Sequence, residues 1–454
     1  MKNNEYRGHV LVVPYPSQGH INPLLQFAKR LAFKGVKATI ATTHYTVKFI
    51  CAPNIGVESI SDGFDDGGFS QAKSEEVFLK SFKANGSSTL SQLILKYQNT
   101  DHPVNCVVYD SFLPWALDVA HQHSIYGAAF FTNSATVSSI FCRIHHGLFS
   151  LPLEPKNMPL CIPGGPPLEF RDLPSFLKLP ESYPVYLAMK LSQFSNLEKA
   201  DWVFGNTFHG LEAEVAKEIC NHWPGKLIGP MVPSTYLDGR IEGDKGYGAD
   251  LWNPLSEQCM KWLETKTPNS VIYVSFGSMV SLTEEQMGEI AWGLKESGFY
   301  FLWVVKEHDR IKLPKGFIEL SKDEGLVITW CNQLEMLAHE AIGCFVTHCG
   351  WNSTLEGLSL GVPMVGIPQW ADQLTDAKFV ADIWEVGVRP NEDEKGVVRK
   401  EELIKCLKVV MEGKRSQKIR MNSLIWKSKA LEAIGEGGSS DKCINEFATF
   451  LSSN

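Results

Sequence analysis

The stretch from Trp330 to Gln373, WCNQLEMLAHEAIGCFVTHCGWNSTLEGLSLGVPMVGIPQWADQ, decides the fold of this chain. Its pattern predicts, in order, a strand end, a short helix, a strand, a helix, a strand and the start of another helix, which is the alternation of a parallel α/β sheet. The polar residues of the stretch gather where strands end and helices begin. Nucleotides bind to open α/β sheets at that edge.

The turn from His348 to Ser353 has the composition of a phosphate site. It follows the apolar run GCFVT and precedes a helical stretch that Gly361 ends, so helix N–H groups and the positive end of the helix dipole would face an anion there. His348, Asn352 and Ser353 add side-chain donors. An alternative is that Ser353 and Glu356 form a capping box, S-x-x-E, which needs no ligand, and spacing alone favours this alternative.

Trp330, at the end of the strand GLVITW, is open to two interpretations. Its ring could stack on a base or fill the core, and taken alone the core is favoured. The complete stretch, however, contains W-x-x-Q, H-x-x-x-G-x-F-x-T-H-C-G-W-N-S, E-x-x-x-x-G-V-P and P-x-x-x-D-Q in order. With these motifs it resembles the signature box of plant family 1 UDP-dependent glycosyltransferases. It departs at Cys331-Asn332, where the family usually has Ala-Pro, but position 331 acts there through its backbone.

The resemblance implies a site for the nucleoside of a UDP-sugar. Trp330 would stack on uracil, and the backbone of Cys331 would bond to the edge of the base. Gln333 and Glu356 would hold the ribose hydroxyls. The co-substrate would then be UDP-glucose, with no cofactor.

The resemblance also implies contacts to the diphosphate and to the sugar. The implied diphosphate contacts are His348, Trp351, Asn352 and Ser353. The implied sugar contacts are Trp370, Asp372 and Gln373. A glutamine at position 373, where some relatives have histidine, indicates glucose rather than galactose.

The N-terminal part predicts a second parallel sheet. HVLVVPYP is a first strand, a helix capped by Asn22 with Pro23 in its first turn follows, and VKATIATT is the next strand. This β-α-β order implies parallel strands and a right-handed crossover. His20 is expected in the loop after the first strand, and Asp110 ends the strand NCVVYD. Both residues should therefore lie at one edge of the sheet.

A histidine and an aspartate at one edge can form an orienting pair, in which the carboxylate fixes the imidazole tautomer. Without further information, a single histidine in a loop is more often a polar residue that forms hydrogen bonds with its near neighbours. The resemblance implies that His20 is the catalytic base and Asp110 its partner. It also implies that Thr132 contacts sugar or phosphate and that Ser278 contacts phosphate; the alternatives are a strand-end threonine that caps the next helix and an ordinary turn serine.

Length and composition limit the number of domains, the possible partners and the cellular compartment. A chain of 454 residues with 44% hydrophobic and 21% charged residues predicts two globular domains. A net charge of -8 without a basic stripe argues against a nucleic-acid partner. Eleven cysteines without C-x-x-C pairs indicate a reducing compartment, hence the cytoplasm. No stretch predicts a signal peptide or a membrane span.

The predicted fold class is α/β, with two Rossmann-like lobes facing across a cleft, as the resemblance to GT-B enzymes implies. The predicted division is an acceptor-binding lobe over 1–235, a polar, glycine-rich linker over 236–255, a donor-binding lobe over 256–430 and a C-terminal helix over 431–454 that packs back on the first lobe. A monomer is expected. The acidic clusters at Asp65-Asp66 and Asp393 are expected in solvated loops, so no metal site is predicted.

The acceptor is the least determined partner. Residues 151–180, rich in proline and glycine, predict an ordered, mostly extended loop. Candidate pocket walls, for each of which core packing is the simpler alternative, are Phe112, Phe131, Phe141, His145, Phe176, Met189 and Phe194. YDSFLPWALDVA is similar to the group that glucosylates salicylate, other carboxylic acids, steroids and triterpenoids. Apolar walls favour a hydroxyl on a lipophilic skeleton; the alternative is ester formation on a carboxylic acid. A nucleotide-sugar-binding protein or an epimerase also remains open.

Overall fold

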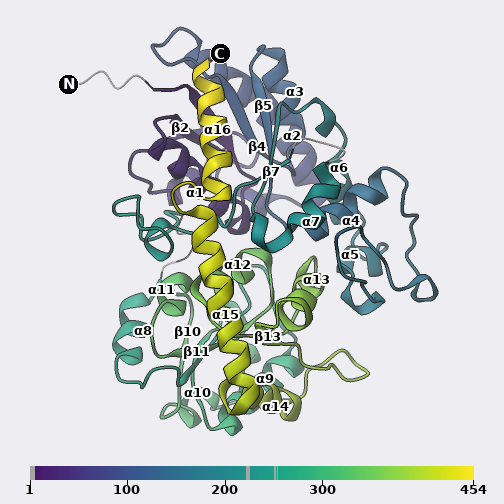
Figure 1. The fold of residues 1–454 in the computed structure, drawn as a ribbon, viewed down its shortest axis with the longest axis vertical. Coiled ribbons are helices and arrows are strands. Elements are labelled where there is room, and N and C mark those ends of the chain that lie inside the picture. The colour runs from purple at the N-terminus through teal and green to yellow at the C-terminus, as the bar shows by residue number, and fades with distance from the viewer. Residues whose placement is uncertain (1–5, 221–224, 250–251, 253, 454) are drawn as a thin grey trace. The chain divides into compact units, whose positions relative to one another are not determined.

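The chain forms two compact units, each built on one parallel sheet (Figure 1). The computed structural model describes residues 6–220, 225–249, 252 and 254–453. The first unit comprises Met1–Phe170, Phe176–Leu251 and Glu432–Asn454, and the second comprises Arg171–Ser175 and Trp252–Leu431. Two parallel sheets covered by helices confirm the predicted α/β class.

The first unit holds a seven-stranded sheet in the order β3-β2-β1-β4-β5-β6-β7, with every neighbouring pair parallel. The strands are β1 His9–Val13, β2 Lys37–Thr43, β3 Gly56–Ile60, β4 Cys106–Asp110, β5 Tyr126–Phe131, β6 Trp202–Gly205 and β7 Gly225–Leu227. All five residues of β1 are buried. Continuous burial is expected of a central parallel strand, because helices cover both faces of the sheet.

The second unit repeats this plan with six strands in the order β10-β9-β8-β11-β12-β13. The strands are β8 Val271–Ser275, β9 Tyr300–Val304, β10 Gly325–Ile328, β11 Ile342–Thr347, β12 Met364–Gly366 and β13 Gly387–Val388. In both sheets the order reverses beside the first strand, β1 or β8. This strand order is that of doubly wound sheets, whose ligands bind beyond the carboxyl ends of the strands.

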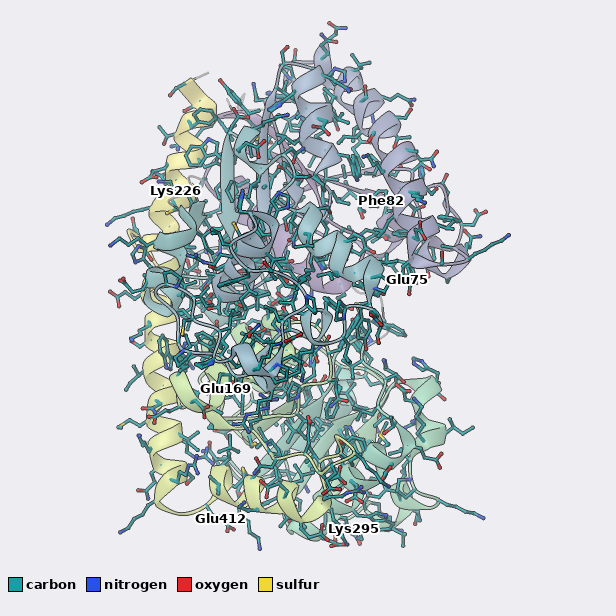
Figure 2. The ribbon with its side chains drawn as sticks, turned by 90° about the vertical axis from the view of Figure 1, so that its right-hand side faces the viewer. Glu75, Phe82, Glu169, Lys226, Lys295 and Glu412 are labelled. Carbon is teal, nitrogen blue, oxygen red and sulfur yellow. The ribbon has the colours of Figure 1, made fainter. Side chains whose placement is uncertain are left out.

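Helices connect and cover the strands. In the N-terminal part they are α1 Gln18–Phe33, α2 Glu75–Gln98, α3 Trp115–Gln122, α4 Ala135–His145, α5 Ser175–Lys178, α6 Pro184–Ser192 and α7 His209–Cys220. The others are α8 Ser256–Leu263, α9 Glu284–Ser297, α10 Phe317–Leu320, α11 Gln333–Leu337, α12 Trp351–Leu360, α13 Gln373–Lys378, α14 Lys400–Met411, α15 Gly413–Ile434 and α16 Ser439–Ser453. Their side chains fill the space around the sheets (Figure 2), as Phe82 of α2 does at 1% exposure.

Helix α1 begins earlier than its sequence suggests. Ser17, not Asn22, is the N-cap, and Pro23 lies inside the helix. The Ser17 carbonyl accepts hydrogen bonds from the N–H groups of His20 (3.0 Å) and Ile21 (2.9 Å), which starts the helix before the proline. His20 therefore lies in the first turn of α1 rather than in a loop, which gives its backbone a fixed orientation.

Residues 171–175 belong to the second unit, although the sequence predicts that they lie in the first lobe. Ser175 and Ala371 exchange hydrogen bonds: the Ala371 N–H donates to the Ser175 hydroxyl at 2.7 Å, and the Ser175 N–H donates to the Ala371 carbonyl at 2.9 Å. The Asp172 carboxylate pairs with Arg389 at 3.1 Å. These contacts join residues about 200 positions apart in the chain, and no local pattern announces them.

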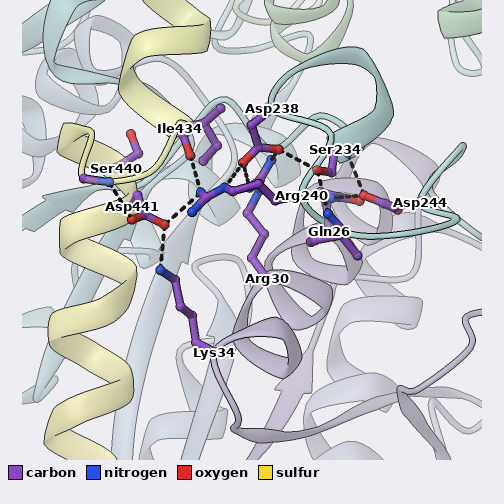
Figure 3. A network of polar contacts seen from close by, with 12 residues as sticks. Gln26, Arg30, Lys34, Ser234, Asp238, Arg240, Asp244, Ile434, Ser440 and Asp441 are labelled. Atoms are coloured by element: carbon purple, nitrogen blue, oxygen red, sulfur yellow. Dashed lines mark hydrogen bonds and ion pairs between the residues drawn. The ribbon is translucent and has the colours of Figure 1, made fainter.

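The expected linker, 236–255, differs from a flexible tether where the structure describes it. Asp238 pairs with Arg30 of α1 at 3.2 Å and with Arg240 at 2.7 Å, and Arg240 also reaches Asp441 of α16 at 2.9 Å (Figure 3). Lys34 pairs with Asp441 at 2.8 Å. The polar composition that suggests a linker thus supplies a buried ion-pair network inside the first unit, and the change of unit falls between 251 and 252.

The last helix, α16, belongs to the core of the first unit. Ile444 and Phe447 are 1% and 0% exposed, and the Phe447 ring lies 5.0 Å from that of Phe204 on β6. Figure 1 shows α16 in yellow at the end of the chain. In the described ranges, no helix is long and apolar enough to cross a membrane.

We expect Arg30→Met to destabilise the first unit by about 3 kcal/mol, because it leaves the buried Asp238 carboxylate without one of its cationic partners. Both side chains are 4% exposed, so water cannot replace the lost contact. Urea unfolding followed by fluorescence measures the change. The control is Lys80→Met, which breaks an exposed pair with Glu76 and should leave the unfolding free energy almost unchanged. Equal losses in the two variants would contradict the importance of the buried pair.

Candidate functional site

The first unit brings His20 and Asp110 into direct contact. The Asp110 Oδ2 atom lies 2.7 Å from His20 Nδ1, and the Asp110 side chain is completely buried, whereas that of His20 is 16% exposed. The second carboxylate oxygen, Oδ1, accepts the Phe112 N–H at 3.0 Å. Because Nδ1 faces the carboxylate, Nε2 on the other side of the ring is the nitrogen that can act on a ligand. The pair has the geometry of a histidine base with an orienting aspartate.

Thr132 joins this group. Its hydroxyl lies 3.3 Å from His20 Nδ1. The alternative, that Thr132 caps the following helix, is not what the structure shows: Ser134 is the N-cap of α4, and its hydroxyl accepts the Val137 N–H. Thr132 is therefore available to the site, one residue beyond the end of β5.

Glu212, which the sequence does not single out, fixes the start of α4. Its carboxylate accepts the N–H groups of Ala135 and Thr136, both at 2.9 Å, and the Thr136 hydroxyl at 2.8 Å. Burial raises the pKa of this carboxyl group. Helix α7 has non-helical backbone angles at Glu212, and the interaction spans 76 residues or more of sequence. Only the fold brings this carboxylate to the segment that carries Thr132.

In the second unit, the turn before α12 places a glycine at the helix N-cap. The helix starts at Trp351, and its N-cap, Gly350, has no side chain that could bond to the first turn. Ser353 is thus the third helical residue rather than the cap, so the capping-box alternative is wrong. Cys349, just before the cap, has a left-handed backbone (φ 60°). This conformation is uncommon for a residue with a side chain and is found most often at functional turns.

The two residues expected to hold a ribose meet each other. The Gln333 side-chain amide donates to Glu356 Oε2 at 2.6 Å and to the Ser353 hydroxyl at 2.9 Å. Glu356 is 5% exposed. Gln333 begins α11 and Glu356 lies in the middle of α12, so the contact brings one carboxylate and one amide from two helices together. Such a pair can accept from and donate to neighbouring hydroxyls.

Trp330 and Cys331 follow β10 after one intervening residue, Thr329. The Trp330 ring is partly exposed and lies 5.6 Å from that of Trp252, and its carbonyl accepts the Leu255 N–H. The Cys331 side chain is 4% exposed, with its Sγ 3.5 Å from the Tyr273 hydroxyl. The partial exposure of Trp330 argues against the interpretation that it only fills the core.

His348 is packed tightly against backbone. A Cβ atom added to Gly350 would lie 2.5 Å from its Nε2, and one added to Gly277 would lie 2.9 Å from the same atom. Burial lowers the pKa of His348 to about 4. The ring is therefore neutral at pH 7 and can serve an anion as a hydrogen-bond donor rather than as a charge.

Lys306, which sequence reasoning did not identify, shapes the loop that carries Ser278. Its ammonium group donates to the carbonyl oxygens of Ser278 at 3.1 Å and Val280 at 2.5 Å. The side chain is 7% exposed, and burial lowers its pKa. Lys306 thus holds the Ser278 loop closed by bonding to its backbone.

The residues expected to meet the sugar form a tight turn before α13. The Gln373 side-chain oxygen accepts the N–H groups of Gln369 (3.0 Å) and Trp370 (3.2 Å), and Asp372 is the N-cap of α13. Ala371 between them is left-handed (φ 57°). Gln373 therefore shapes this turn, in addition to making the sugar contact predicted for it.

The candidate acceptor walls fall into groups of rings in the first unit. Phe112 lies 4.6 Å from the His20 ring, and Phe194 lies 5.7 Å from Phe131 and 5.9 Å from His145. Phe176 stacks on Tyr186 at 5.5 Å. Apart from exposed His145, the seven candidates are 8% exposed or less, Phe141 and Met189 included. The Phe112 ring touches the His20 ring, so a wall role has most support there.

Within the described parts of the chain, no group of three or more His, Cys, Asp or Glu side chains is placed to hold a metal ion. Metal-independence stays a prediction.

Known proteins resemble this chain over almost its whole length. The profile of the family described as UDP-glucoronosyl and UDP-glucosyl transferase matches residues 221–434. UDP-glycosyltransferase 74B1 of Arabidopsis thaliana is 53% identical over 98% of this chain and 98% of its own length, and mogroside I-E synthase of Siraitia grosvenorii is 44% identical with the same coverage.

Solved structures agree. The crystal structure of Os79 from O. sativa in complex with UDP is 38% identical, covers 97% of this chain and 100% of its own, and superposes with a TM-score of 0.93. This likeness confirms the predicted two-lobed fold class.

We expect His348 to make the fold sensitive to acid. Its folded pKa of about 4 lies below the ordinary histidine value of 6.5, so protonation favours the unfolded chain. Its stabilising effect is complete above pH 6.5 and is lost as the pH falls from 6.5 towards 4. His348→Gln, whose side chain stays neutral, should lose less unfolding free energy than the parent between these pH values.

Urea unfolding at a series of pH values measures this difference. Above pH 7 the gap between parent and variant should be constant, which is the internal control. His9, whose pKa burial also lowers to about 4, is present in both proteins and cancels in the comparison. Parallel curves down to pH 4 would show that His348 titrates normally.

Proposed function

The chain belongs to the UDP-glycosyltransferase family, and from this premise we propose that it transfers glucose from UDP-glucose to a hydroxyl group of a lipophilic plant small molecule, with inversion and without a metal ion. The class of acceptor would be steroid, terpenoid or phenolic. The product would be a β-glucoside.

The contact between His20 and Asp110 is the observation that carries the proposal. A hydroxyl is not nucleophilic until its proton leaves, and a neutral imidazole held by a carboxylate can take that proton. The acceptor oxygen attacks the anomeric carbon as the bond from this carbon to the phosphate oxygen breaks. The proton passes to His20 Nε2, the electron pair of the broken bond leaves with UDP, and Asp110 stabilises the imidazolium that forms. One displacement of this kind converts an α-linked donor into a β-linked product.

The second unit is proposed to bind UDP-glucose. The start of α12, with glycine as its cap, would offer N–H groups to the diphosphate, and neutral His348 would add a donor. Gln333 and Glu356 would hold the ribose, and the turn of Trp370, Asp372 and Gln373 would hold glucose. With these donors the chain would stabilise the leaving diphosphate by positioned dipoles.

The acceptor class rests on the ring groups of the first unit and on the names of relatives. One relative, 46% identical, is named flavonol 7-O-beta-glucosyltransferase, and Os79 has been crystallised with a trichothecene. Both names describe hydroxylated apolar molecules. The alternative, a glucose ester on a carboxylic acid, depends less on His20, because a carboxylic acid near neutral pH is already ionised. We also propose that the protein acts as a monomer in the cytoplasm.

We expect His20→Ala to lower kcat/KM for an alcohol or phenol acceptor by about 100- to 10,000-fold, because no group remains to take the proton. The measurement is UDP release and glucoside formation with UDP-glucose against a panel of phenolic acids, flavonoids, steroids and triterpenoids. Binding of UDP should be unchanged, which is the control for folding. If only carboxylic acids are glucosylated and His20→Ala keeps its rate on them, the enzyme forms glucose esters instead.

The same assay without acceptor separates the other function classes. Rapid loss of UDP-glucose with no acceptor present would indicate hydrolysis or epimerisation, and binding of UDP-glucose without any turnover across the panel would indicate a binding protein. Either result would contradict the proposed transfer.

We expect Glu356→Gln to weaken UDP binding by about 10-fold or more, because a buried carboxylate that accepts from hydroxyls is replaced by an amide. Titration calorimetry with UDP and with its 2′,3′-dideoxy analogue tests the role directly: the loss should appear with UDP and be small with the analogue. Glu340→Gln, which removes one exposed carboxylate from the same unit, is the matched control. Equal losses for the two ligands would assign Glu356 to the shape of the site alone.

A further inference from the structure

Helix α15 (Gly413–Ile434; Figure 1) presents a row of apolar side chains to solvent. Met421, Leu424 and Ile425 are 56%, 59% and 46% exposed, and Leu431 is 42% exposed. Residues three, four and seven positions apart lie on one face of a helix, so these four side chains form a single stripe, which we call the α15 stripe. A contiguous apolar stripe is uncommon on the surface of a soluble protein, and where polar residues rim it, it indicates an interaction surface.

The opposite face of α15 is packed into the protein. Ile419, Ser423 and Ala430 on that face are buried, and Ile419 belongs to the core around the second sheet. The Trp426 indole N–H donates to the Trp384 carbonyl at 3.3 Å. These contacts fix the helix on its own unit, so the α15 stripe faces away from the second sheet.

Basic residues border the α15 stripe on both sides. Between residues 413 and 431 the helix has no aspartate or glutamate, and its six basic residues are Lys414, Arg415, Lys418, Arg420, Lys427 and Lys429. At about 100° per residue, Lys418 and Lys429 lie along one edge of the stripe, and Arg420 and Lys427 lie along the other. The whole chain, in contrast, has a net charge of -8. Positive charge is therefore concentrated where the apolar side chains are exposed.

Most of these basic side chains are accessible to an anion. Five of the six are exposed, and the sixth, Arg420, is partly exposed and donates to the Asn269 side-chain oxygen at 2.8 Å. Lys418 pairs with Glu385 at 2.7 Å, but the two side chains are 59% and 50% exposed, and such surface pairs contribute little to stability. These groups can therefore exchange their contacts for the phosphates of a lipid surface.

We propose that the α15 stripe and its basic borders form a docking surface for a membrane that contains anionic phospholipids. The helix lies parallel to the membrane plane, the four apolar side chains enter the headgroup region, and the lysines and arginines meet the lipid phosphates. A helix that lies on a membrane in this way does not span it. The inference goes beyond the proposed function, and vesicle binding tests it without any transfer reaction.

The chemistry of the α15 stripe favours a membrane over a second copy of the chain or another protein. A two-fold contact between copies would bring the same six positive charges together, and like charges repel. Protein interfaces are usually anchored by buried aromatic residues, whereas the α15 stripe consists of leucine, isoleucine and methionine on a convex helix. Fluid lipid adapts to a convex surface, and the long stems of lysine and arginine reach the phosphates while the apolar side chains insert.

The test is flotation of the full chain with vesicles of phosphatidylcholine alone, or of phosphatidylcholine and phosphatidylserine in a ratio of about 7 to 3. We expect binding to the anionic vesicles that weakens as the salt concentration rises, because salt screens exposed charges. The double variants Lys427→Gln/Lys429→Gln and Leu424→Gln/Ile425→Gln should each lower the partition coefficient by about 10-fold or more, since each removes part of one of the two attractions.

Matched controls come from exposed side chains in and just before α2, in the first unit. Val77→Gln/Leu95→Gln replaces two apolar side chains that are 43% and 49% exposed, and Lys73→Gln/Lys83→Gln replaces two exposed lysines. Both variants should bind vesicles as the parent does. Urea unfolding of all four variants should give the free energy of the parent, because every substituted side chain is exposed.

Several results would overturn the inference. The parent would have to leave anionic vesicles unbound, bind both kinds of vesicle equally, or lose as much binding through the α2 controls as through the α15 variants. A dimer of the parent in sedimentation equilibrium that Leu424→Gln/Ile425→Gln disperses would assign the α15 stripe to a second copy of the chain. Binding to polyglutamate in place of vesicles would assign it to an acidic protein.

Discussion

A parallel sheet that is covered by helices on both faces leaves mainly the ends of its strands for polar chemistry, and this constraint places the His20–Asp110 pair and several of the predicted donor contacts. Asp110 ends β4, Thr132 follows β5 by one residue, and Trp330 and His348 come just after β10 and β11. The central strands β1, β4, β8 and β11 are buried along their whole length. The side chains that can act on a ligand therefore gather at the carboxyl ends of strands, where the backbone turns into helices.

The backbone at these turns is as specific as the side chains. Helices α2 and α9 begin at Ser74 and Thr283, whose side chains accept hydrogen bonds from the first turn. Helix α12 instead follows Gly350, a cap without a side chain, which comes after the left-handed Cys349. N–H groups at the start of a helix are suited to an anion. His348 lies so close to Gly350 that position 350 must be glycine, because a Cβ atom there would collide with the imidazole ring.

Features that depend on neighbouring residues could be predicted from the sequence, whereas contacts between residues far apart in the chain could not. The two sheets follow from hydrophobic periodicity, and His20 and Asp110 follow from their places after strands. The predicted start of α1 was wrong. Pro23 suggested a helix that begins just before the proline, whereas α1 begins at Gln18 and contains Pro23 in its interior. The ion pairs that hold residues 236–246 in the first unit depend on partners far away in the chain, as does the capping of α4 by Glu212. The sequence shows that these charged residues are present but not which residues they pair with.

A buried lysine that is already bonded and a neutral histidine limit the charge that the second unit offers to a phosphate. Lys306 donates to the carbonyl oxygens of Ser278 and Val280 and lies 3.6 Å from the Asp309 carboxylate, so its charge shapes a loop. A phosphate would have to compete with these bonds. His348 adds no charge at pH 7, because burial lowers its pKa to about 4. If the departing diphosphate relies on the chain alone, as proposed, oriented N–H groups at the start of α12 must then stabilise most of its charge.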